Sequence, residues 1–174
     1  MNEQDYVLQQ LDYHRWANRR VVEHVEGLTE RVYLQPIESV FPTIYETMAH
    51  IYIIDRGWLT FLQQGGVAEM SAAYLEQLQA SIASIQAEIQ GLSMISLGAY
   101  MDEVCLELRS HVEQLDDIAA SLPSGSVAMR IADYLQHLVH HGVYHRGNVT
   151  AMLRQLGHAG TPTDYGFYLY TLQA

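Results

Sequence analysis

Apolar residues recur at spacings of three and four along most of this chain, which is the pattern of helices that bury one face. Five stretches follow it: residues 4–28, 43–64, 71–92, 100–122 and 126–156. Prolines and most glycines fall between these stretches, and no two-stranded hairpin is predicted. The pattern predicts an all-α protein whose helices pack around one core, with a short aromatic tail after residue 157.

The length and composition predict one globular domain over residues 1–174. A chain of 174 residues with 49% hydrophobic and 17% charged residues is long enough to bury one full core, whereas two domains of half that size would each be marginal. The single cysteine, Cys105, lies between Val104 and Leu106 and is predicted to pack in the core rather than to react as a thiol.

The charge argues against several classes of partner. Nine arginines and no lysines stand against twenty acidic residues, which gives a net charge of −11. Nucleic acids and anionic membranes require cations gathered on one face, and here the arginines are scattered along the chain. No apolar run reaches the roughly 18 residues of a membrane span, and the polar start Met1–Asp5 does not resemble a signal peptide. We therefore expect a cytoplasmic protein that binds neither nucleic acid nor membrane.

Histidines are concentrated near the end of the chain. Five of the nine lie in the last predicted helix or just beyond it: His137, His140, His141, His145 and His158. At about 100° of rotation per residue, His141 and His145 face the apolar stripe, while His140 points away and His137 lies at the boundary. Imidazoles four residues apart on one helix face are close enough to bind one ion. Hydrogen-bonded histidines are also common in cores, so the pair alone leaves both interpretations open.

His50, in the second predicted helix, supplies a third inward imidazole. Its neighbours are apolar, and an ionisable ring there needs a partner, such as a metal ion, to offset its desolvation. Three neutral imidazoles from facing helices would leave the ion its full charge and one open position. His14 and Asn18 in the first helix either reach the same cavity or bond to each other. Glu46 is either a partner of the His50 ring or a solvated carboxylate.

Two segments of the last helix carry a specific motif: His137–Asn148 (HLVHHGVYHRGN) and Met152–Gly157 (MLRQLG). They resemble the closing motif of the DinB family of damage-inducible metalloproteins. Tyr13–Asn18 (YHRWAN) resembles the first-helix signature of that family, and His50 stands in the place of its second-helix ligand. The resemblance covers nearly the whole chain and is weakest over residues 65–100.

The resemblance implies a four-helix bundle of up-down-down-up topology. Parallel middle helices need a long crossover, which the helical segment over residues 71–92 would supply. It also implies a divalent ion, zinc or nickel, bound by three histidines: His50, His141 and His145. His140 departs from the motif, which has asparagine at that position. A register in which His137 and His141 are the ligands stays open.

The wider superfamily includes thiol-dependent transferases and isomerases, so the resemblance implies a metal-dependent enzyme of transferase or hydrolase type that acts on a small molecule. The ion would lower the pKa of a low-molecular-weight thiol or activate water. Arg146 would either hold a substrate carboxylate or form an interhelical salt bridge, and Tyr144 and Asn148 would donate hydrogen bonds near the ion. The family also leads us to expect a homodimer.

Two alternative interpretations of the function involve no catalysis. One is a non-catalytic metal-binding homodimer, induced by stress or damage. The other is a purely structural bundle whose histidines are ordinary polar groups of the core. Turnover that is lost on His145→Ala while the fold survives would distinguish an enzyme from the first, and a protein that binds no metal would match the second.

Overall fold

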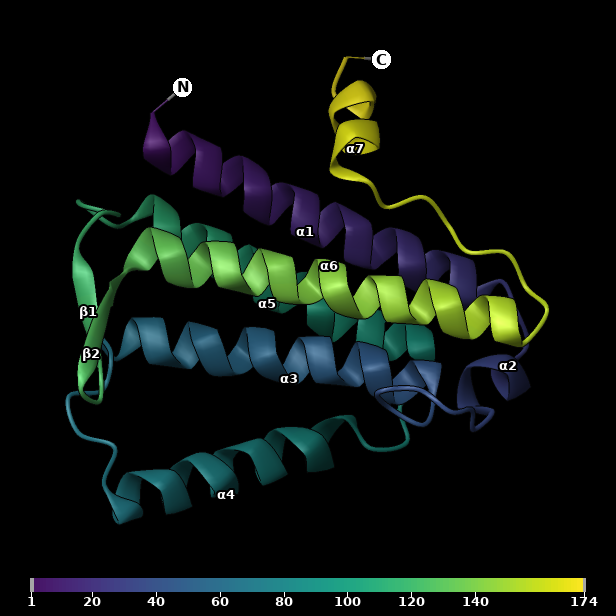
Figure 1. The fold of residues 1–174 in the computed structure, drawn as a ribbon, viewed down its shortest axis with the longest axis horizontal. Helices are drawn as coiled ribbons and strands as arrows, with labels where there is room; N and C mark the ends of the chain where they lie inside the picture. Colours follow the sequence, from purple (N-terminus) through teal and green to yellow (C-terminus); the bar gives the residue numbers. More distant parts are fainter. Residues whose placement is uncertain (1, 174) are drawn as a thin grey trace.

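The computed structural model describes residues 2–173 and is helical over most of its length, which confirms the all-α fold class. Four long helices form the body: α1 (Glu3–Glu26), α3 (Ile44–Gln63), α5 (Met94–Glu113) and α6 (Ile131–Gln155). α1 packs against α5 and α6, and α3 packs against the same two helices from the other side. Figure 1 shows α1 and α6 running in one direction and α3 and α5 in the opposite direction.

The core lies between these four helices, and each contributes large aliphatic side chains to it. Leu11, Ile51, Leu108 and Leu135 are all buried. Burying one such side chain stabilises the folded state by about 1.5–3 kcal/mol. The chain enters α1 through a capping box, in which the Asn2 side chain accepts from the backbone N–H of Asp5.

The helix α4 (Ala72–Ile89) lies outside the four-helix body, alongside α3 (Figure 1). It begins after Ser71, whose side chain accepts from the backbone N–H of Tyr74. Ile89 is the one fully buried side chain of α4, and Leu75 and Leu78 on the same helix are exposed. This is the segment predicted over residues 71–92, and it joins α3 to α5 while contributing little to the core.

The helix predicted over residues 100–122 is displaced in the structure, because α5 begins at Met94 and ends at Glu113. Ser93 caps it by accepting from the backbone N–H of Ser96. Gly98 lies inside the helix rather than before it. A Cβ at this position would lie 2.5 Å from Cγ1 of Val22, so Gly98 marks the close approach of α5 to α1.

The expectation of no hairpin is wrong. The strands β1 (Ser121–Ser124) and β2 (Val127–Arg130) pair antiparallel, with Ser124 opposite Val127. The turn between them is Gly125–Ser126, and Gly125 has a φ of +61°, which glycine adopts without strain. As a result, α6 begins at Ile131 instead of Ser126.

Two short helices also lie outside the sequence prediction: α2 (Glu30–Leu34) and α7 (Tyr165–Thr171). The segment before α7 is fixed to α1, since the Tyr13 hydroxyl donates to the carbonyl of Thr163 over 2.8 Å. From there α7 stands steeply against α1 (Figure 1), and its Tyr168 is buried against the rings of Tyr13 and Trp16. Within residues 2–173, no helix has the length and apolar character needed to cross a membrane.

Candidate metal centre

Three histidines from two helices converge between α3 and α6. His50 lies on α3, and His141 and His145 lie one turn apart on α6. One ligand nitrogen from each ring lies within 4.8 Å of the other two. Nε2 of His50 is 3.1 Å from Nε2 of His141, and the ring centroid of His145 lies 4.7 Å from that of His50 and 4.4 Å from that of His141. The structure thus brings together the three side chains that the sequence singled out.

The donor set fits a divalent ion. In tetrahedral coordination with metal–nitrogen distances of about 2.0–2.1 Å, two ligand nitrogens lie roughly 3.3 Å apart. The separation between the Nε2 atoms of His50 and His141 is close to that value. Nδ1 of His141 and Nδ1 of His145 are buried, and neither has a hydrogen-bond partner among the described residues. An imidazole that binds an ion through Nε2 carries its ring proton on Nδ1, so the fit to an ion rests on the separation of the Nε2 atoms and not on these two nitrogens.

Burial keeps all three imidazoles neutral at physiological pH. It lowers the pKa of His141 to about 3, with a further contribution from the neighbouring histidines, His145 first among them. The pKa of His145 is lowered to about 4 by burial and by His50. Burial also lowers the pKa of His50. Because a metal ion binds the deprotonated ring, these shifts prepare the cluster for binding.

The same shifts predict how the metal-free protein responds to acid. The folded pKa values of His141 and His145 lie below the ordinary histidine value of 6.5, so the unfolded chain binds more protons than the folded chain as the pH falls below 6.5. The free energy of unfolding is therefore expected to decrease from pH 6.5 toward pH 4. Urea unfolding of wild type and His141→Gln at several pH values measures this, and the decrease should be shallower in the variant. Equal decreases in both proteins would contradict the prediction.

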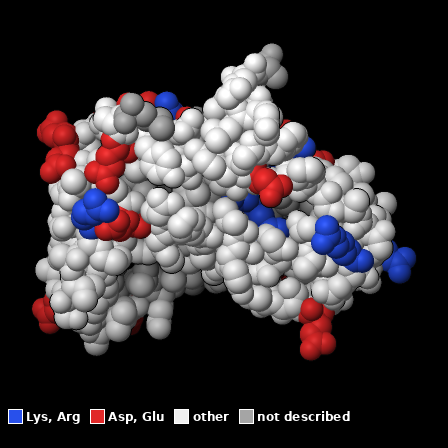
Figure 2. Space-filling view, turned by 45° about the horizontal axis from the view of Figure 1, so that its top comes forward, with Lys and Arg blue, Asp and Glu red and all other residues white. Residues whose placement is uncertain are grey.

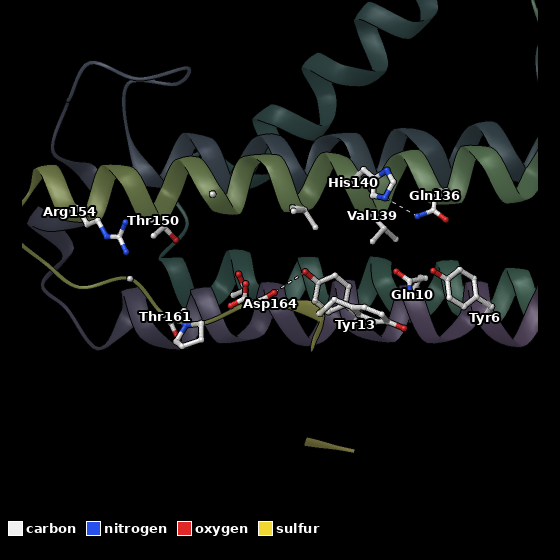
Figure 3. Close-up of a pocket in the computed structure, with 16 residues that line it drawn as sticks. Tyr6, Gln10, Tyr13, Gln136, Val139, His140, Thr150, Arg154, Thr161 and Asp164 are labelled. Atoms are coloured by element: carbon white, nitrogen blue, oxygen red, sulfur yellow. Dashed lines mark hydrogen bonds between the residues drawn. The ribbon is translucent and has the colours of Figure 1, made fainter. Parts of the chain in front are cut away.

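The other two histidines of α6 lie outside the cluster. His137 is exposed and packs edge-on against Trp58, with ring centroids 5.6 Å apart. His140 lies on the opposite side of α6, where its Nε2 contacts the side-chain amide of Gln136 over 2.9 Å (Figure 3). The structure therefore groups His141 with His145 rather than with His137.

A cavity of about 540 Å³ between α3 and α4 reaches the cluster at His50. Phe41 forms part of its wall and packs against the rings of His50 and His145, at centroid distances of 4.5 and 5.7 Å. Glu46 also lines this cavity, but its carboxylate accepts from the Thr43 hydroxyl over 2.9 Å. Within residues 2–173, no hydrogen bond joins Glu46 to His50. The Glu46 carboxylate therefore takes part in the cap at the start of α3 and is not a partner of the His50 ring.

A larger cavity, of about 750 Å³, lies between α1, α6 and the segment that leads to α7 (Figure 3). Tyr13, Arg154 and Asp164 contribute polar groups to it. None of the three cluster histidines is among its lining residues in the described chain. The two cavities are therefore separate, and the smaller one serves the histidine cluster.

A buried polar network lies in the core beside the cluster. Nε2 of His14 donates to Oδ2 of Asp55 over 2.9 Å, and Nη1 of Arg146 donates to Oδ1 of Asn18 over 2.7 Å. Nη1 of Arg146 also faces Nδ1 of His14 at 3.4 Å, and a donor on that side indicates that the ring proton of His14 is on Nε2. All four side chains are at most 2% exposed. His14 and Asn18 thus belong to this network, not to the histidine cluster.

Cys105 adjoins the same network. The structure confirms that it is buried and free, and burial raises the pKa of its thiol well above the usual value. One donor atom from each of His14, Asp55 and Cys105 lies within 4.8 Å of the others. The neighbouring Arg146 cation competes with any ion for this space, so these groups form a hydrogen-bonded core network.

One member of the network, Asp55, was not anticipated from the sequence, and Arg146 makes an interhelical contact, which is nearer to the second of its two expected roles. Asp55 lies on the buried stripe of α3 between Ile51 and Leu59 at spacings of four, so an acid on an apolar stripe was the available signal. Arg146 points into the core with 1% of its surface exposed, and burial lowers its pKa. The expected contact between Arg146 and a substrate carboxylate therefore has no accessible surface on which to form.

Tyr144 and Asn148 remain next to the cluster on α6. The ring of Tyr144 packs edge-on against His145 at 4.9 Å, and more than half of its surface is exposed. The side-chain nitrogen of Asn148 is buried and has no hydrogen-bond partner within the described part of the chain. Of the two expected donors, Tyr144 is therefore accessible beside His145, whereas the amide nitrogen of Asn148 is enclosed.

Comparison with known proteins identifies the family of this chain. The model of the DinB family matches residues 1–173. The chain belongs to the DinB family. Among known members, Protein DinB of Bacillus subtilis (strain 168) is 35% identical over 168 residues, which cover 95% of this chain and 95% of that protein. The resemblance to the DinB family seen in the sequence motifs is thus confirmed.

Proposed function

We propose that this protein binds one divalent metal ion, zinc or nickel, through His50, His141 and His145. The observation that carries the proposal is the convergence of three neutral imidazole nitrogens within 4.8 Å. Imidazole suits both ions, and availability in the cell decides between them. The site would lie in a single-domain four-helix bundle of up-down-down-up topology over residues 1–174. The directions of α1, α3, α5 and α6 and the crossover α4 support that topology (Figure 1).

The bound ion would supply Lewis acidity that lowers the pKa of a thiol or of water, which is the chemistry of a thiol transferase or a hydrolase. Several residues near the proposed ion would assist this chemistry. The Tyr144 hydroxyl would orient the substrate from the exposed side. The amide nitrogen of Asn148 is buried, so it would help to hold α6 in place beside the ion and would not contact the substrate itself. Phe41 would exclude water from the face it covers on His50 and His145. Arg146 would hold its neighbour His145 in place through the core network.

Metal content tests the first part of the proposal. Untagged protein purified without chelator or added metal is expected to carry about one ion per chain, measured by mass spectrometry. Incubation with zinc or nickel should raise the thermal midpoint, since the ion binds the folded state. A protein that binds neither ion would overturn the proposal and favour a purely structural bundle.

Turnover tests the second part. A screen of thiols against electrophiles and of hydrolysable esters and amides should reveal activity that His145→Ala abolishes while the helical content persists. If the metal-loaded protein converts none of these, the non-catalytic metal-binding protein becomes the better description. We expect a homodimer in either case, which sedimentation measures.

The proposed ligand is a small molecule and not a nucleic acid. On the face shown in Figure 2, the arginines are scattered and acidic side chains lie beside several of them. Arg15 pairs with Asp102, and Arg130 pairs with Glu3 and Asp133. Such pairs cannot displace counterions from a phosphate backbone. A duplex shifted by the protein at physiological salt would contradict this part.

A further inference from the structure

The cavity at His50 has two walls of different origin. One wall comes from α3 and the segment before it, and the other comes from α4. The hydroxyl of Tyr45 on α3 donates to the carbonyl of Ile89 on α4 over 2.6 Å, which joins the walls at one end. At about 540 Å³ the cavity has the size of sites that take small organic molecules.

The lining is apolar apart from a few polar groups. Phe41, Tyr45, Ile53 and Ile89 supply apolar surface, and Gln86 and Gln90 supply amides from α4. Glu46 is the charged side chain among the lining residues within positions 2–173, and no arginine lines the cavity there. The carboxylate of Glu46 accepts from the Thr43 hydroxyl and forms no ion pair in the described structure.

We propose that this cavity selects small molecules whose non-coordinating part carries no negative charge, and that it favours a cationic group beside Glu46. The inference rests on the proposed function, because it takes His50 as a ligand of the ion. Three neutral imidazoles leave the ion its full charge, so it attracts the donor end of any ligand. The rest of the ligand then faces an unpaired carboxylate and no cation. An anionic group there is repelled, and a cationic group gains a partner.

Three small thiols test this selectivity: 2-(trimethylammonio)ethanethiol, 2-mercaptoethanol and 2-mercaptoethanesulfonate. The quaternary ammonium cannot coordinate a metal and the sulfonate is a poor ligand, so the sulfur of each thiol is the donor and the charged group stays free. The full-length protein is loaded with Co²⁺, whose visible absorption changes when a ligand joins the histidines, and each thiol is titrated at pH 7.5. We expect the cationic thiol to bind about tenfold more tightly than the sulfonate, with 2-mercaptoethanol between them.

The three thiols differ in acidity, which by itself changes their affinity for the ion. The deciding quantity is therefore the ratio of the affinity of the cationic thiol to that of the anionic thiol, compared between wild type and a variant of Glu46. Glu46→Gln keeps the length and the capping oxygen of the side chain and removes its charge, so it should reduce the ratio at least threefold. Glu76→Gln is the matched control, because Glu76 is an exposed acid on α4 that does not line the cavity. It should leave the ratio unchanged.

The outcomes separate this inference from the function on which it rests. If cobalt produces no histidine-bound absorption, the metal site itself is absent and both fail. If cobalt binds but 2-mercaptoethanesulfonate is the tightest ligand, or the ratio is the same in wild type and Glu46→Gln, the charge selectivity is overturned and the metal site stands. The expected order together with its loss in Glu46→Gln supports the inference.

Discussion

Substituting His141 by alanine is expected to weaken zinc binding by about 100-fold or more. A three-histidine site gains several kcal/mol from each ligand, and about 2.7 kcal/mol already corresponds to a factor of 100. His141 contacts both partners, since its Nε2 lies 3.1 Å from that of His50 and its ring centroid lies 4.4 Å from that of His145. Competition with a chromophoric zinc chelator measures the affinity of each variant.

His137→Ala is the control for this measurement, because His137 is on the same helix and exposed, one turn before His141. Its zinc affinity should stay within about twofold of wild type, while His50→Ala and His145→Ala should lose binding as His141→Ala does. Loss of zinc in His137→Ala with retention in His145→Ala would show that the ligands follow the other register on α6.

Asp55→Asn is expected to reduce the free energy of unfolding by about 3 kcal/mol. Arg146 is 1% exposed and remains protonated in a protein. Tyr13 and, more weakly, Asp55 favour its charged form, and His14 lies between Arg146 and Asp55, which form no direct ion pair among the described residues. Asp55 also accepts the hydrogen bond of His14. Removing the negative charge from this buried network leaves the buried cation without compensation. The resulting loss in the free energy of unfolding is larger than the stability that the complete network contributes. Urea unfolding of wild type and variant gives the difference.

A double-mutant cycle identifies the cause of that loss. With Arg146→Met already present there is no buried cation to compensate, so adding Asp55→Asn should cost at least about 1 kcal/mol less than it does in wild type. Arg154→Met on the same helix is the control. Its side chain is exposed, and its substitution should cost less than about 0.5 kcal/mol. Additive effects of Asp55→Asn and Arg146→Met would show that the two side chains act independently.

The helical fold class was predictable because apolar spacing records which face of each helix is buried. The boundaries were harder to predict where glycine had a different role. Gly98 suggested a helix break in the sequence, but in the structure it lies where α5 approaches Val22 of α1 closely. The spacing of apolar residues carries no information about such a contact between helices. Gly125–Ser126 is a recognisable hairpin turn, yet the apolar residues on both sides of it continue a helical spacing and concealed the two short strands.

The histidine set was predictable for a similar reason, since the helical period places His141 and His145 on one face and the motif indicates His50. The role of Asp55 was not. For Arg146 the sequence allowed either a substrate contact or an interhelical salt bridge, and the packing of α1 against α6 shows that Arg146 turns inward to Asn18. Gly142 makes this packing feasible, because a Cβ there would lie 2.3 Å from Cε1 of His14.

The loose attachment of α4 has a consequence for how such proteins diverge. The four core helices are constrained together, since each buries side chains against two others. By contrast, α4 buries Ile89 and little else, while its residues Ala83, Gln86 and Ala87 form a wall of the cavity at His50. Mutations in α4 therefore alter the cavity at little cost in stability. Over evolutionary time, new ligand preferences would arise first in this crossover helix, while the histidines and the bundle that holds them stay the same.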